Sequence, residues 1–222
     1  NAIIENKWHL EINRTFSIFS WDRFRTLYSS IRYHNKLKWL QLKILRRCLH
    51  TNRIVSKYDQ DVRNVCDFCD DSPENISHLF FNCNIVKLFL GELEQFLHLI
   101  HLPVRFNEKN VLFGNPDLSA HSFQNLIILY IKGFIWFCKH SKTRPCLNKF
   151  KSYVRPYIKT LELIATFRND LENFSRDWHI FDSHLVAGPA PPGEEQGDLQ
   201  PAQDPGPPGE QGLPADHRPQ AG

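Results

Sequence analysis

Apolar side chains recur at intervals of three and four residues along most of the chain, a spacing that places them on one side of an α-helix. The longest such stretches predict helices over residues 17–29, 36–49, 83–101, 119–140 and 146–175. Arg144-Pro145 separates the last two stretches, and Pro156 is expected to kink the final helix. The pattern therefore predicts a mainly α fold.

Capping residues predict two shorter helices between these stretches. Thr51 can cap a short helix of its own, and Ser72-Pro73 is a typical helix start that places His78 on a helix running to Phe81. In contrast, Val111–Gly114 is short and predicts an extended piece or a turn.

Composition changes sharply at Ala187. Residues 188–222 hold 9 of the 14 prolines and 7 of the 10 glycines, and they contain no aromatic residue. Such a segment buries too little apolar surface to offset the entropy lost on ordering. A disordered Pro/Gly-rich tail is therefore expected.

Charge divides at the same position. The tail carries six acids and one arginine, whereas residues 1–187 carry 26 Lys and Arg against 18 Asp and Glu. The net charge of +3 therefore combines a body of +8 with a tail of −5. A basic body favours polyanionic partners.

Four residues with metal-binding side chains form a C-x2-C-x8-H-x4-C array: Cys66, Cys69, His78 and Cys83. Three thiols and one imidazole complete a tetrahedral ligand set for zinc and leave no open position, so one structural zinc ion is predicted. The alternative is four unmetallated residues with Cys83 packed in a helix, but the spacing favours the metal. Cys48, Cys138 and Cys146 lack partners at ligand spacing and are expected to be core residues.

The segment around this array is acidic. Residues 66–83 contain Asp67, Asp70, Asp71 and Glu74 and no lysine or arginine. An acidic knuckle is a poor phosphate clamp, so its expected role is to hold neighbouring helices in place. Four parts are then predicted: a basic helical segment over residues 1–65, a CCHC zinc knuckle over 66–83, a helical segment over 84–187 and the tail over 188–222.

Two basic regions are candidates for contact with nucleic acid. Residues 30–65 carry nine Lys and Arg against two acids, and residues 118–161 carry eight and no acid. The candidate contacts are Lys36, Trp39, Lys43, Arg46, Arg47 and Arg53 in the first region and Lys151, Arg155 and Lys159 in the second. The alternative is a solvated helix face with Trp39 buried.

Motifs for catalysis, secretion and membrane insertion are missing from the sequence. It has no Gly-rich phosphate loop, nucleophile elbow or pair of polymerase-type aspartates, so neither enzymatic activity nor a small-molecule substrate is expected. The N-terminus does not have the pattern of a signal peptide, which predicts an intracellular protein of the nucleus or cytoplasm. The apolar run Leu126–Cys138 is too short to span a bilayer and predicts a buried helix.

Several segments of the chain resemble one known family. They are residues 39–52, the Cys66-x2-Cys69 pair, Glu74–Cys83, Asn110–Gly114, Asn125–Lys132 with Phe134-Ile135 and Cys138, and Phe174-x3-Trp178. Together they are similar to the zinc-binding region that lies C-terminal to the reverse transcriptase in LINE-type non-LTR retrotransposons. The likeness extends over residues 20–180.

This resemblance implies a module of a longer polyprotein that helps to bind template RNA or target DNA during target-primed reverse transcription. Cys66, Cys69, His78 and Cys83 match the metal positions of the family. The endonuclease and polymerase domains are absent and the sequence contains no methionine, so a fragment that does not itself synthesise DNA is expected.

Two further interpretations stay open. In one, the zinc knuckle and the apolar helices dock onto the missing polymerase domain as a structural or protein-interaction module. In the other, the chain is a retrotransposon remnant without a selected role.

Overall fold

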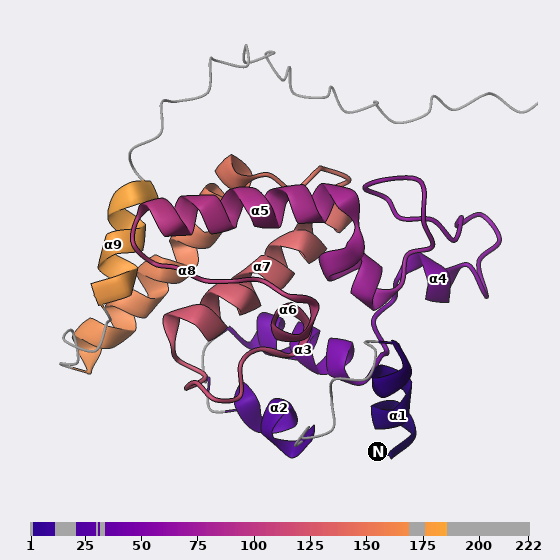
Figure 1. Ribbon diagram of the computed structural model, residues 1–222, viewed down its shortest axis with the longest axis horizontal. Helices are drawn as coiled ribbons and strands as arrows, with labels where there is room; N and C mark the ends of the chain where they lie inside the picture. The colour runs from indigo at the N-terminus through magenta and orange to yellow at the C-terminus, as the bar shows by residue number, and fades with distance from the viewer. Residues whose placement is uncertain (1, 12–20, 30, 32–33, 169–175, 186–222) are drawn as a thin grey trace, which may run out of the picture. The chain divides into compact units, whose positions relative to one another are not determined.

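The computed structural model describes residues 2–11, 21–29, 31, 34–168 and 176–185. Within these ranges the regular elements are helices (Figure 1): α1 (Ala2–Glu11), α2 (Trp21–Leu27), α3 (Asn35–Leu45), α4 (Asn52–Val55), the π-helical turn η1 (His78–Asn82), α5 (Asn84–Leu99), α6 (Glu108–Phe113), α7 (Phe123–His140), α8 (Leu147–Phe167) and α9 (Arg176–Leu185). The mainly helical fold predicted from the sequence is therefore confirmed. The chain divides into two units, Asn1–Gly188 and Pro189–Gly222, and the second unit lies outside the described residues, as does the predicted tail.

Helix α7 forms the centre of the first unit. Its side chains are buried along almost the whole helix, and it packs against α3, α6, α8 and η1. The ring of Phe134 lies 5.4 Å from that of Phe89 on α5, between centroids. Figure 1 shows α7 crossing between α5 and α3. A helix that is hydrophobic on nearly every side is stable in such a central position.

Val111–Gly114 is mostly helical, so the prediction of an extended piece or turn was wrong. The segment belongs to α6, whose first turn is closed by a capping box. The Asn107 side chain accepts from Asn110 N, and the Asn110 side chain accepts from Asn107 N, both at 2.9 Å. Gly114 ends the helix with φ 84°, and a Cβ there would lie 2.6 Å from Tyr28 Oη, so both conformation and space require glycine.

Helix α3 ends earlier than the predicted helix over residues 36–49. Its last residue is Leu45, and Arg47 has φ 56° in the left-handed region, so the chain turns away there. Helix α1, which the apolar pattern did not predict, packs at this turn. Trp8 Nε1 donates to Leu45 O at 3.0 Å, and the Arg47 guanidinium lies 4.3 Å from the centre of the Trp8 ring.

The longer predicted helices lie near their expected positions. Helices α5, α7 and α8 each begin within about one turn of the predicted start. Pro156 lies inside α8. Residues 12–20 and 169–175, which belong in part to predicted helices, lie outside the described residues.

Lys132 is fully buried in the middle of α7. Its amine donates to Gln41 Oε1 and to Leu112 O, and it lies 5.3 Å from the centre of the Tyr28 ring. Burial lowers the pKa of Lys132 well below the ordinary value, since these contacts include no carboxylate. The native chain therefore releases this proton at a lower pH than the unfolded chain does.

Lys132→Met is expected to remove a pH dependence of stability. Between the lowered native pKa and the unfolded value of about 10.4, the unfolded chain binds a proton that the native chain does not. The parent's free energy of unfolding therefore rises with pH in this window, by up to about 1.4 kcal/mol per unit, and that contribution is lost as the pH falls. Urea denaturation of both proteins from neutral pH to about pH 10 measures the difference. Parallel stability profiles would contradict the expectation.

Candidate metal centre

The four residues of the Cys/His array come together in the structure. Their ligand atoms, three Sγ atoms and one ring nitrogen, all lie within 4.8 Å of one another. Cys66 Sγ lies 3.9 Å from Cys83 Sγ, and Cys69 Sγ lies 3.4 Å from His78 Nε2. Cys66 and Cys83 are buried, whereas Cys69 and His78 are partly exposed. One metal ion could therefore contact all four side chains.

A tight turn positions the first two ligands. Asp70 N donates a hydrogen bond to Cys66 O at 2.9 Å, and Phe68 N donates one to Cys66 Sγ at 3.5 Å. The backbone therefore folds around the sulfur. Asp70 has φ 57°, and Cys66 N donates to Ser72 O at 2.9 Å, which closes the loop. Phe68, between the two cysteines, is buried in the hydrophobic core and anchors the turn.

A single π-helical turn positions His78 and Cys83. Cys83 N donates to His78 O at 2.9 Å, which is a bond between residues five apart. In an α-helix such residues would lie about 140° apart around the axis, so the wider turn brings the two side chains closer together. The predicted helix start at Ser72-Pro73 was wrong, because Asn75 Oδ1 accepts from His78 N at 2.7 Å and caps the turn there.

Burial and hydrogen bonding favour the metal-binding form of two of these groups. Burial lowers the pKa of His78, against the opposing effect of the Glu74 and Asp71 carboxylates. The hydrogen bond from Cys66 lowers the pKa of Cys83, and the same contact, together with burial, raises the pKa of Cys66. A neutral imidazole and a thiolate are the forms that bind metal.

A buried ion pair joins the segment that carries the Cys/His array to α7. Glu74 is fully buried, its Oε1 lies 2.7 Å from Lys139 Nζ, and the same oxygen accepts from Asn52 N at 2.8 Å. Lys139 Nζ also lies 2.5 Å from Asp67 Oδ2 and donates to Asn52 Oδ1 at 2.8 Å. The side-chain amide of Asn52 donates from Nδ2 to Val65 O and to Asp67 Oδ1, both at 2.8 Å. We call Asn52, Asp67, Glu74 and Lys139 the Glu74–Lys139 cluster; it connects the knuckle, the start of α4 and the end of α7.

This cluster changes the electrostatics expected for the knuckle. Lys139 forms ion pairs with Asp67 and Glu74, and Arg63 lies 2.8 Å from Asp70. Both cations lie outside residues 66–83, so the net charge of that segment alone does not include them. The segment therefore presents less negative charge than its composition indicates. The sequence has no spacing pattern that predicts Lys139 or Asn52 as partners of Asp67 and Glu74.

Four of the candidate contact residues lie exposed on α3 and at its C-cap: Lys36, Trp39, Lys43 and Arg46. At about 100° per residue they fall within one side of the helix. Trp39 is 63% exposed, so the alternative of a buried Trp39 was wrong. Arg53 is exposed on α4, whereas Arg47 is partly buried and stacks on Trp8.

The second basic group makes contacts within the chain. Lys151 Nζ lies 3.8 Å from the centre of the Phe96 ring, and Arg155 donates to a backbone carbonyl of α9 at 2.9 Å. Lys159 forms ion pairs at 3.1 and 3.7 Å with carboxylates of α8 and α9. These side chains therefore connect α8 to α5 and α9.

No protein-family model, curated protein or solved structure matches the chain. Among the described helices, none is both long and apolar enough to cross a membrane.

Proposed function

We propose that the chain is a zinc-stabilised nucleic-acid-binding module, of the kind that lies C-terminal to the reverse transcriptase in non-LTR retrotransposons. The Cys/His cluster is the observation that supports the metal. A tetrahedral zinc ion bound to sulfur at about 2.3 Å and to nitrogen at about 2.0 Å separates its ligand atoms by about 3.5–3.8 Å. The separations of 3.9 Å for Cys66 and Cys83 and 3.4 Å for Cys69 and His78 are close to these values.

The proposed role of the zinc ion is structural. Three thiolates and one imidazole fill all four positions, so none is left for a substrate or an activated water molecule. The Glu74–Lys139 cluster then connects the zinc-bound segment to α4 and α7. Zinc would thereby hold residues 52–83, much of which has no regular secondary structure, against the helical core.

The exposed side of α3 is the proposed contact for nucleic acid. Lys36, Lys43 and Arg46 lie beside Trp39, and α3 contains no acidic residue. Cationic side chains bind phosphates with release of condensed counterions, and an exposed aromatic ring can stack on a base. Arg53 is a further exposed candidate. The basic row on α8 is secondary, because its side chains already have partners within the chain.

Reversing two charges on α3 is expected to weaken nucleic-acid binding. In the full chain, Lys43→Glu combined with Arg46→Glu removes two phosphate contacts. Affinity at low salt should fall, and the slope of log K against log salt should decrease by about one unit per lost contact. Fluorescence anisotropy with a short RNA and a short DNA across a salt series measures both quantities.

The matched control is Lys87→Glu combined with Arg105→Glu, which changes the net charge equally at exposed positions on α5 and the following loop. This variant should bind nearly as tightly as the parent. A control that weakens binding as much as the α3 variant would refute the proposed interface. A parent chain that binds neither RNA nor DNA at low salt would refute nucleic-acid binding altogether.

A further inference from the structure

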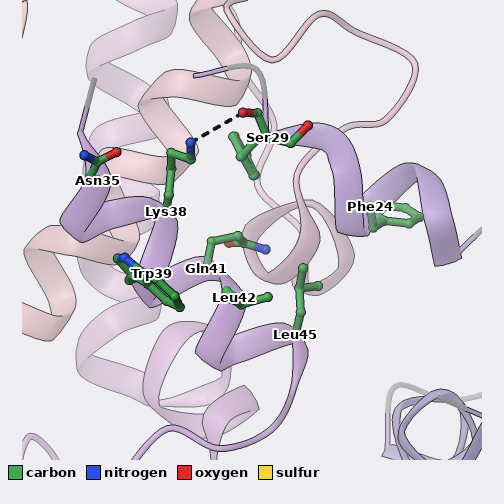
Figure 2. A pocket seen from close by; sticks show the side chains of 9 residues that line it. Phe24, Ser29, Asn35, Lys38, Trp39, Gln41, Leu42 and Leu45 are labelled. Carbon is green, nitrogen blue, oxygen red and sulfur yellow. Dashed lines mark hydrogen bonds between the residues drawn. The ribbon is translucent and has the colours of Figure 1, made fainter. Parts of the chain in front are cut away.

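A pocket of about 340 Å³ lies between α2 and α3. Figure 2 shows Trp39, Leu42 and Leu45 along α3, with Phe24 contributed by α2. Phe24 and Leu45 are buried, and Leu42 is partly buried. The pocket therefore has a largely apolar lining. One of its walls is α3, the helix that carries the proposed cationic contacts.

Trp39 belongs both to this pocket and to the basic side of α3. At about 100° per residue it lies between Leu42, which lines the pocket, and Lys43, which does not. Its indole is 63% exposed, although burial of so large an apolar ring would be favourable. An exposed aromatic ring beside an apolar pocket and flanking cations has the features of a stacking platform for single-stranded nucleic acid.

We propose that this pocket holds an unpaired base of single-stranded RNA or DNA, stacked on Trp39, while flanking phosphates contact Lys43 and Arg46. The inference rests on the nucleic-acid binding proposed above and specifies its substrate as a single strand. Bases in a duplex are already paired and stacked on their neighbours, so a duplex would have to be opened to fill the pocket. Unpaired bases can be splayed out onto an aromatic side chain without that cost.

Two polar side chains of the pocket, those of Lys38 and Gln41, are already bonded within the protein. Lys38 Nζ donates to Ile31 O at 2.5 Å and to Ser29 O at 3.4 Å, the second of which is drawn in Figure 2. Gln41 Nε2 donates to Leu112 O at 3.0 Å, and Gln41 Oε1 accepts from a buried lysine. Because these two groups are already bonded, they are not expected to read the edge of a base, and stacking on Trp39 would give most of the affinity.

Trp39→Ala in the full chain tests the pocket. Anisotropy measures binding to single-stranded RNA, single-stranded DNA and a duplex of the same sequence, and a 2-aminopurine base in each single strand reports stacking by quenching. We expect Trp39→Ala to weaken single-strand binding by about tenfold, as for the loss of one stacked base, and to leave duplex binding unchanged. Trp39→Phe should retain most of the affinity. Tyr58→Ala, at another exposed aromatic position, is the matched control.

The outcomes separate this proposal from the one on which it rests. If Trp39→Ala weakens no single strand, or weakens it no more than Tyr58→Ala does, the pocket is refuted and the charge interface on α3 stands. If the parent binds no nucleic acid at low salt, both proposals fail. Absence of 2-aminopurine quenching by the parent would refute the pocket even if Trp39→Ala failed to fold. The RNA and DNA arms identify which strand the pocket holds.

Discussion

Cys83→Ser is expected to abolish binding of the proposed zinc ion and to loosen residues 52–83 at the same time. Cys83 is buried with its sulfur 3.9 Å from Cys66 Sγ, and a serine hydroxyl does not replace a thiolate as a zinc ligand. The binding energy of a structural zinc is folding energy, about 10–16 kcal/mol in small zinc-finger peptides, so much of the local stability should be lost. Zinc content per full chain and amide hydrogen exchange measure the two effects.

Cys48→Ser is the matched control. Cys48 is exposed, so its prediction as a core residue was wrong, and it lies outside the cluster. It should keep one zinc per chain and the exchange pattern of the parent. Treatment of the parent with a chelator should reproduce the exchange pattern of Cys83→Ser. If chelation leaves the exchange of residues 52–83 unchanged, the metal does not have the structural role proposed for it.

Lys139→Met is expected to destabilise the chain by about 3–5 kcal/mol, since it leaves a buried carboxylate without its cation. Glu74 is 0% exposed, and its Oε1 lies 2.7 Å from Lys139 Nζ. The remaining hydrogen bonds, from Asn52 N and Asp67 N, do not neutralise the charge. The effect is measured as the difference in the free energy of unfolding in urea between the parent and Lys139→Met, both loaded with metal.

A double substitution separates the charge from the packing. Lys139→Met combined with Glu74→Gln removes both charges and keeps an amide oxygen that can accept from Asn52 N, so it should be more stable than Lys139→Met alone. Lys142→Met, at an exposed position after α7, should change stability by less than about 0.5 kcal/mol. A double variant as unstable as Lys139→Met would show that the ion pair is not the cause.

The grouping of the four Cys and His residues was predictable because they are local. All four lie between Cys66 and Cys83, and their spacing requires only a tight turn and one helical turn to bring them together. The same locality explains why α5, α7 and α8 were predicted near their observed positions. A long amphipathic or fully apolar stretch has few possible structures other than a helix.

Contacts between distant residues were not predictable in this way. Lys139 and Asp67 are 72 residues apart, and the sequence contains nothing that singles out this lysine from its exposed neighbours. The end of α3 was missed because Arg47 takes a left-handed conformation at the corner where Trp8 packs. Helix α6 was missed because its start depends on reciprocal side-chain bonds between two asparagines, and its apolar run is too short to show a period.

The Glu74–Lys139 cluster also sets an order of events during protein synthesis. A ribosome makes the chain from its N-terminus, so all four residues of the Cys/His array are translated before Lys139. The four side chains can therefore come together while Glu74 is still hydrated, and residues 66–83 can dock only after α7 has been translated. Until then α4, four residues long, has no partner in α7. Premature termination before α7 would thus leave residues 66–83 without the helix that carries Lys139.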